Sequence, residues 1–200
     1  DTSCTTSVCI PAQKSWKLIG QTGQINDLCT YQCKLYAAGN FTQIGTESAL
    51  NIAVWDGHSW SSLGTGTNGP INALAVHNGL LFVGGKFTDA GGLTDANNIA
   101  VWNGNSWSKL DNGVPDSNGL ATVNALLSHS SGLIVGGVFK QAGNLVKINT
   151  QNIARWNGTN WEAPYMASFN GPVNTLGLYQ NQLYAGGVFS IPNNNISVWN

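Results

Sequence analysis

Charged residues are scarce in this 200-residue chain. Only 8% are Asp, Glu, Lys or Arg, against about 25% in an ordinary soluble domain. The polar surface comes instead from Asn, Gly, Ser, Thr and Gln, which favour turns and strand ends over helix interiors. The net charge is −1 and no basic stripe is present, so we expect no nucleic-acid partner. Long apolar runs are also lacking, and none approaches the ~20 residues that span a membrane.

Cysteine is rare, and its four positions do not fit a zinc site. Cys4, Cys9, Cys29 and Cys33 lack paired CxxC spacing, and no histidine lies nearby. An even number of cysteines predicts two disulfides in an oxidising compartment. A bond between Cys29 and Cys33 would close a short loop and constrain the unfolded chain little. We therefore favour bonds from the tail, residues 1–13, to the rest of the chain, with the individual pairing left open.

Three N-glycosylation sequons agree with an oxidising compartment. They begin at Asn40, Asn157 and Asn195. A chain rich in Asn, Ser and Thr also produces such triplets by chance. Together with the cysteines and a start at Asp1 rather than Met, they predict a secreted, extracellular glycoprotein.

A repeat of about fifty residues organises the chain. A Gly-x-Phe triplet ends at Phe41, Phe87, Phe139 and Phe189. Asn-Ile-Ala-Val-Trp, or a close variant, ends at Trp55, Trp102, Trp156 and Trp199. A second tryptophan series contains Trp16, Trp60, Trp107 and Trp161, so every tryptophan belongs to one of two repeated positions.

Each unit divides into four short strand-like segments, called a to d. In the second unit we expect strands over residues 70–76, 80–87, 98–102 and 106–110. The dipeptides Asn78-Gly79 and Asn103-Gly104 are strong hairpin signals between them. The two tryptophans that flank a c–d turn can pair across the strands. Each unit therefore predicts one antiparallel four-stranded sheet.

Four such sheets around an axis predict an all-β, four-bladed β-propeller over residues 14–200. The blades span about 24–64, 70–110, 122–163 and 172–199. The last lacks a d segment, and residues 14–19 form a spare one, so we expect the N-terminal strand to close the last blade, with Trp16 beside Trp199. The alternatives are a piece of a larger ring and a dimer that forms an eight-bladed ring.

The repeat also resembles a known family. Leu-x-x-Gly-Gly-x-Phe occurs at 81–87, 133–139 and 183–189, and Ala38 replaces the first of these glycines in unit one. With the later Asn-Ile-Ala-x-Trp, these runs resemble kelch-type propeller repeats, of the kind in the galactose oxidase central domain and many secreted bacterial and fungal proteins. The resemblance covers residues 14–200 and implies the fold. The oxidase's copper-binding Tyr and His have no counterpart here.

The loops between segments b and c vary most, and variable loops on a rigid scaffold favour binding. They span 42–50, 88–97, 140–151 and 190–194. In the second of them, Asp89, Asp95 and Asn97 are candidate ligand-binding residues, and their oxygens could hold calcium. Asx turns in a solvated loop are the favoured explanation of these side chains, and we expect no cofactor or metal.

The tryptophans offer a second candidate surface. Trp60, Trp107 and Trp161 of the d series could stack on sugar rings, although strict repetition argues first for packing. His58, His77 and His129 do not repeat, and no Gly-x-Ser-x-Gly motif accompanies them, so we expect no enzyme.

These observations predict a secreted carbohydrate-binding, lectin-like module whose partner is a glycan or an extracellular protein. Self-association is left open. The alternatives are a structural building block of an extracellular matrix, coat or fibre, and a protein–protein interaction propeller.

Overall fold

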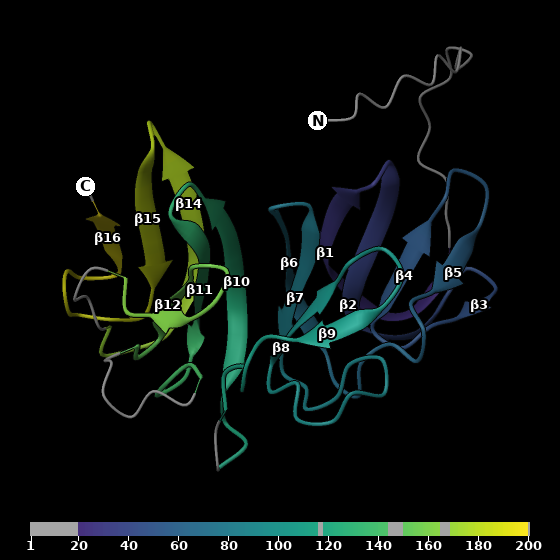
Figure 1. The fold of residues 1–200 in the computed structure, drawn as a ribbon, viewed down its shortest axis with the longest axis horizontal. Helices are drawn as coiled ribbons and strands as arrows, with labels where there is room; N and C mark the ends of the chain where they lie inside the picture. Colours follow the sequence, from purple (N-terminus) through teal and green to yellow (C-terminus); the bar gives the residue numbers. More distant parts are fainter. Residues whose placement is uncertain (1–19, 116–117, 144–149, 165–168, 200) are drawn as a thin grey trace.

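The computed structural model describes residues 20–115, 118–143, 150–164 and 169–199, which form four antiparallel sheets (Figure 1). The first sheet contains β1 (Gln21–Tyr31), β2 (Lys34–Ile44), β3 (Glu47–Ser48), β4 (Ile52–Trp55) and β5 (Trp60–Ser62). The second contains β6 (Ile71–His77), β7 (Leu80–Gly85), β8 (Ile99–Trp102) and β9 (Trp107–Lys109). The third contains β10 (Thr122–His129), β11 (Gly132–Val138), β12 (Ile153–Trp156) and β13 (Trp161–Glu162). The fourth contains β14 (Val173–Tyr179), β15 (Gln182–Gly187) and β16 (Ile196–Trp199).

Each predicted unit forms one sheet, and its strands pair in sequence order. The all-β class and the four sheets are therefore confirmed, and the described residues contain no helix that could cross a membrane. The d strands span only two or three residues, and β3 adds a short pair with β2 that the sequence did not predict. The fourth sheet has three described strands, because the expected d strand, residues 14–19, lies outside the described residues.

The predicted tight turns follow from local side-chain chemistry. Asn78 and Gly79 both have positive φ, 48° and 73°, which suits the hairpin turns that match the twist of paired strands. In the c–d turns, one side-chain oxygen instead accepts two hydrogen bonds from the backbone of the turn. The Oδ1 atom of Asn103 accepts hydrogen bonds from the backbone N–H groups of Asn105 and Ser106, and Asp56 and Asn157 repeat this arrangement.

The tryptophans flanking each c–d turn pair across the strands, as predicted. Their ring centroids lie 5.5 Å apart for Trp55 and Trp60 and 5.4 Å apart for Trp102 and Trp107. For Trp156 and Trp161 the distance is 5.3 Å. Such aromatic pairs stabilise a two-stranded ribbon by roughly 0.2–1 kcal/mol each.

Hydrophobic clusters fill the spaces between successive sheets. Three clusters each join one face of a sheet to the opposite face of the next, so both internal sheets are buried on both faces, and a fourth cluster lies within the first sheet. The β-branched pairs at these three contacts are Ile52 with Ile71, Ile99 with Val123, and Ile153 with Val173. Each is at most 2% exposed. Burying one such side chain contributes about 1.5–3 kcal/mol, which makes the contacts between sheets the core of the molecule.

A repeated hydrogen bond also ties each sheet to the next. The first strand of every sheet has a bulge at an asparagine. The side-chain Nδ2 of this asparagine donates to the carbonyl oxygen just before the bulge of the next sheet. The three bonds run from Asn26 to Ile71 at 2.7 Å, from Asn72 to Val123 at 2.9 Å and from Asn124 to Val173 at 3.2 Å.

The four sheets form an open succession. In Figure 1 the first sheet, in purple and blue, and the fourth, in yellow and green, lie at opposite ends of the molecule. Within the described part of the chain, neighbouring sheets pack through their first strands, and the first and fourth sheets do not pack on each other in this way. The predicted contact between Trp16 and Trp199 falls outside the described residues, because Trp16 belongs to the segment that precedes residue 20.

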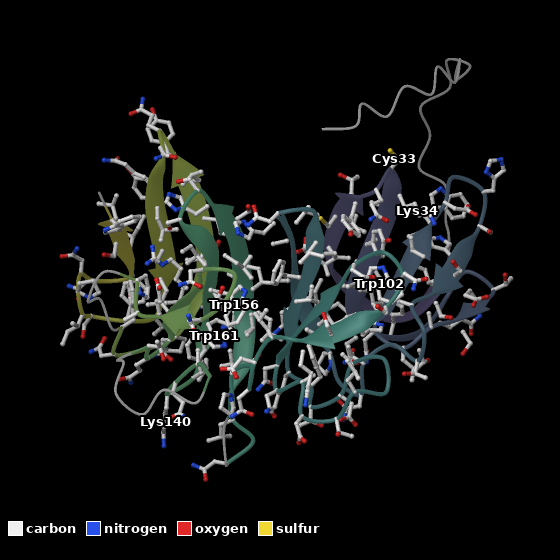
Figure 2. All side chains as sticks on the ribbon, in the orientation of Figure 1. Cys33, Lys34, Trp102, Lys140, Trp156 and Trp161 are labelled. Atoms are coloured by element: carbon white, nitrogen blue, oxygen red, sulfur yellow. The ribbon has the colours of Figure 1, made fainter. Side chains whose placement is uncertain are left out.

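The loops sort to two ends of the sheets, as strand direction predicts. Figure 2 shows Cys33 at the tip of the β1–β2 hairpin and Lys140, at the start of the third b–c loop, at the opposite end. We call these ends the a–b face and the b–c face.

Candidate functional site

A polar cavity of ≈340 Å³ opens on the a–b face, at the ends of β6 and β10. Its lining residues are His77, Asn78, Ser128, His129, Ser130, Ser131, Gly132, Asn157 and Leu178. Hydroxyl, amide and imidazole groups therefore dominate the wall, and no Asp, Glu, Lys or Arg is among the lining residues. Such a wall can exchange hydrogen bonds with a ligand without a formal charge on either side.

The hydrogen bonds of His77 in this wall define one tautomer of its neutral ring. Burial lowers the pKa of His77 below its usual value. The side-chain amide of Asn78 donates to Nε2 at 3.1 Å, so Nδ1 carries the proton. That Nδ1–H then donates to the hydroxyl oxygen of Ser128 at 2.9 Å, which links the second sheet to the third.

His129 has the opposite tautomer. The backbone N–H of Ser131 donates to Nδ1 at 3.2 Å, so the proton of a neutral ring is on Nε2. That Nε2 atom is buried and has no hydrogen-bond partner among the described residues. The ring stands edge-on to Trp199, with centroids 5.7 Å apart. A buried donor without an acceptor is unusual in a folded protein.

The sequence did not reveal this cavity. His77 and His129 occupy the same position at the end of the first strand in neighbouring sheets, where the outer sheets have Tyr31 and Tyr179. The conclusion that the histidines do not repeat was therefore wrong for these two. The equivalence of the two histidines is hard to recognise in the sequence, because the turn after His129 is Ser130-Ser131 whereas the turn after His77 is Asn-Gly.

The hydrogen-bond partners of the two imidazoles are not those of a catalytic triad. In a triad a carboxylate orients the histidine base. Here the polar partners are Ser128, Asn78 and Ser131, and no carboxylate bonds to either ring among the described residues.

Two clefts on the b–c face repeat each other in the second and fourth sheets. One, of ≈260 Å³, has Asn68, Lys86, Thr88 and Asn97 in its wall, and the other, of ≈330 Å³, has Asn170, Val188, Ser190 and Asn194. In both clefts an asparagine side chain holds the b–c loop by hydrogen bonds. The Oδ1 of Asn68 accepts bonds from two backbone N–H groups, of Thr88 and Asp89, and Asn170 accepts from those of Ser190 and Ile191.

Two of the three predicted binding residues of the second b–c loop make bonds within the fold. Asp89 accepts a bond from Asn68 Nδ2 at 3.3 Å, and Asn97 donates to the carbonyl oxygen of Asn112 at 3.1 Å. Asp95 is exposed and has a positive φ of 60°. Within the described ranges, no group of three or more His, Cys, Asp or Glu side chains is arranged to hold a metal ion.

The three described tryptophans of the d series pack against the fold. Trp60 and Trp107 are half-buried, and Trp107 Nε1 donates to the carbonyl oxygen of Leu63 at 3.1 Å. Trp161 is only 1% exposed, inside the cluster between the second and third sheets. Its expected role as a ligand-facing platform is not supported, because its ring is fully buried in this cluster. Figure 2 shows Trp161 beside Trp156.

The two described cysteines differ in state. Cys33, at an exposed hairpin tip, is disulfide-bonded, whereas Cys29 is a free thiol. The prediction that all four cysteines form disulfides is therefore wrong for Cys29. Its side chain is partly buried and packs against the cluster between the first and second sheets. Cys4 and Cys9 lie outside the described residues.

The three sequon asparagines are exposed. Asn40 lies on β2, Asn157 begins a c–d turn and Asn195 precedes β16. Their glycosylation stays a prediction.

Comparison with known proteins bears on the fold alone. No protein-family profile and no curated protein matches the sequence. Among solved structures, the crystal structure of the computationally designed Ika4 protein is similar, with a TM-score of 0.55 and 15% sequence identity. The similarity covers 94% of this chain and 98% of that chain. The chain thus shares its arrangement of sheets with a designed protein, and the kelch-type resemblance stays a prediction.

Proposed function

We propose that the four sheets are blades of a β-propeller and that residues 14–19 supply the missing strand of the fourth. An apolar cavity of ≈210 Å³ beside β16 supports this, with Pro164, Phe169, Pro192 and Trp199 in its wall. Trp107 and Trp161 fill equivalent places, each against the b–c loop of its own sheet, at Gly91 and Gly143. Trp16 holds the same place in the repeat and suits the open space.

On this scaffold we propose a secreted, lectin-like carbohydrate-binding function, with the ligand in the polar cavity of the a–b face. The uncharged polar wall of the cavity is the observation that carries the proposal. Hydroxyls of Ser128, Ser130 and Ser131 and the two imidazoles match the hydroxyl groups of a neutral sugar. A charged ligand would lose its hydration here without gaining an ion pair.

The test is glycan-array binding, followed by calorimetry with any neutral oligosaccharide that binds. The protein is prepared without N-glycans, because Asn157 lines the cavity. The variant Ser128→Ala/Ser131→Ala removes two hydroxyls from the cavity and should weaken binding at least 10-fold. The matched control, Lys86→Ala/Thr88→Ala, changes the b–c cleft of the second sheet and should leave affinity unchanged.

Two results would contradict the proposal. If only the variant Lys86→Ala/Thr88→Ala loses binding, the ligand binds on the b–c face, which the sequence favoured. A folded protein that binds no glycan would exclude the lectin-like function.

A structural building block is the second candidate. The observation that favours it is apolar surface at both ends of the molecule, where Leu28 and Ile196 are exposed. Particles that remain single chains at high concentration, in electron micrographs and in gel filtration, would argue against it.

A further inference from the structure

Successive sheets pack face to face at three places inside the molecule. The outer faces of the first and fourth sheets carry residues that correspond to the two sides of this contact. On the side of each sheet that meets the next, Ile52, Ile99 and Ile153 are 0%, 0% and 2% exposed. The corresponding residue of the fourth sheet, Ile196, is 63% exposed. The fourth sheet therefore has the face that packs on a following sheet, and nothing described covers it.

The first sheet presents the complementary half at its first strand, β1, whereas Ala37 and Ala53 on the same face are buried in a cluster within that sheet. Leu74 of the second sheet packs on the first and is 7% exposed, and Leu126 and Leu176 pack on the sheets before them. The corresponding Leu28 is 57% exposed. Ile25 is likewise only half-buried, whereas its counterparts in the other three sheets are fully buried.

Polar and backbone features are also left incomplete at these ends. The next bond in the asparagine series would run from Asn174 to the carbonyl oxygen of Ile25, and Asn174 donates no such bond among the described residues. A Cβ on Gly84 or Gly136 would lie 2.5 Å or 2.6 Å from a valine methyl of the following sheet. At Gly186 such an atom would meet only Thr175, of its own sheet, closer than 3.9 Å.

A second copy can cover both exposed end faces while the arrangement of the four sheets within each chain stays the same. Joining the first and fourth sheets of one chain would change the packing at the three internal contacts, where β-branched side chains are buried together. Propellers typically have four to eight blades. Because the first and fourth sheets of this chain are apart, the next ring built from whole chains has eight, from two copies (Figure 1).

We propose that two copies of this chain associate head to tail, the fourth sheet of each packing on the first sheet of the other, to close a ring of eight sheets. Each contact is heterologous, and two of them close a ring with twofold symmetry. Residues 14–19 directly precede β1, so this arrangement brings them beside β16 of the other copy. That last detail rests on the strand assignment proposed above, whereas the dimer itself does not depend on any ligand.

The first test is the mass of the intact protein by sedimentation. The ring predicts about 42 kDa, twice the chain's 21.1 kDa. The variants Leu28→Asp and Ile196→Asp each charge a side chain that is exposed in one chain and buried in the ring, so each should return the mass to that of one chain. Leu120→Asp is the matched control, because Leu120 is 67% exposed and lies away from both end faces.

Disulfide trapping decides which ends meet. The Cβ atom built on Gly136 lies 3.3 Å from Val173 Cβ, and Ile25→Cys with Gly186→Cys would reproduce this pair at the end faces. The distance is near the ~3.5–4.5 Å of disulfides. The double variant should give a covalent dimer on a non-reducing gel, with no larger species. Each single variant, carrying the native cysteines, serves as the control.

Other outcomes overturn the proposal. A monomer whose two new thiols are bonded to each other would mean that the ring closes within one chain. A ladder of higher species would mean a filament. A single-chain mass for the wild-type protein, with both new thiols free in the double variant, would exclude the contact altogether.

Discussion

Replacing Asn98 by alanine should destabilise the chain far more than replacing an asparagine of the same backbone conformation at the surface. Asn98 is 9% exposed and has a φ of 70°. Its Oδ1 accepts a bond from the Phe87 backbone N–H at 3.2 Å, and its Nδ2 donates to the Val114 carbonyl oxygen at 2.8 Å. One side chain thus links a b–c loop to the segment that leads to the next sheet.

The expected magnitude follows from those two bonds. Alanine leaves one buried N–H and one buried carbonyl without a partner, at about 1–3 kcal/mol each. Alanine in the left-handed region costs roughly 1–2 kcal/mol in addition. The variant Asn181→Ala has the same backbone strain at a φ of 63°, on an exposed turn. The difference between the two variants should therefore be about 2–6 kcal/mol.

Guanidinium unfolding followed by tryptophan fluorescence measures this difference, and thermal unfolding provides a check. For a chain of this size, 1 kcal/mol shifts Tm by about 2–4 °C, so Asn98→Ala should melt at least about 4 °C below Asn181→Ala. Equal unfolding free energies for the two variants would refute the reasoning, because the buried bonds would then contribute nothing.

Three further predictions follow from packing and titration. Gly84→Ala places a methyl group 2.5 Å from Val123 Cγ1 and should cost about 1–3 kcal/mol in unfolding free energy, whereas Gly177→Ala, in open space, should not. Burial lowers the pKa of His77, so the unfolded chain binds a proton below about pH 6.5 that the folded chain does not, and stability should fall as pH falls through that range. Replacing His77 by Gln should flatten that part of the pH–stability curve. Burial also raises the pKa of the Cys29 thiol, so peptide mapping should find slow alkylation of Cys29 at pH 7 that accelerates on unfolding.

The sequence predicts the strands well because each carries a local signal. The Asn-Gly dipeptides mark turns, and the tryptophans at a fixed spacing mark both sides of each c–d hairpin. The expected strand over residues 98–102 is β8, Ile99–Trp102, and the one over 80–87 is β7, Leu80–Gly85. These features need no information about the rest of the molecule.

The site is harder to predict because it depends on which strand face meets which sheet. Cys29 and Cys33 lie four residues apart around one turn, yet one packs against the second sheet and the other is at an exposed tip. Trp60, Trp107 and Trp161 share a repeat position, yet only Trp161 is fully enclosed, inside the cluster between the second and third sheets. The repeat places the same residue type at equivalent positions. Its burial depends on the sheets on either side, and each end sheet has a neighbouring sheet on one side only.

The sequon at Asn195 shows how repeat position and burial combine. In the first three sheets the corresponding asparagines, Asn51, Asn98 and Asn152, are buried, and each Nδ2 donates to a backbone carbonyl of the segment that follows the d strand. Asn195 is exposed, and no such segment is described beside the fourth sheet. A fourth sheet completed by a d strand would bury this side chain and use its Nδ2, the atom to which a glycan is attached. Glycosylation at Asn195 and completion of the fourth sheet therefore exclude each other, whichever copy supplies the strand.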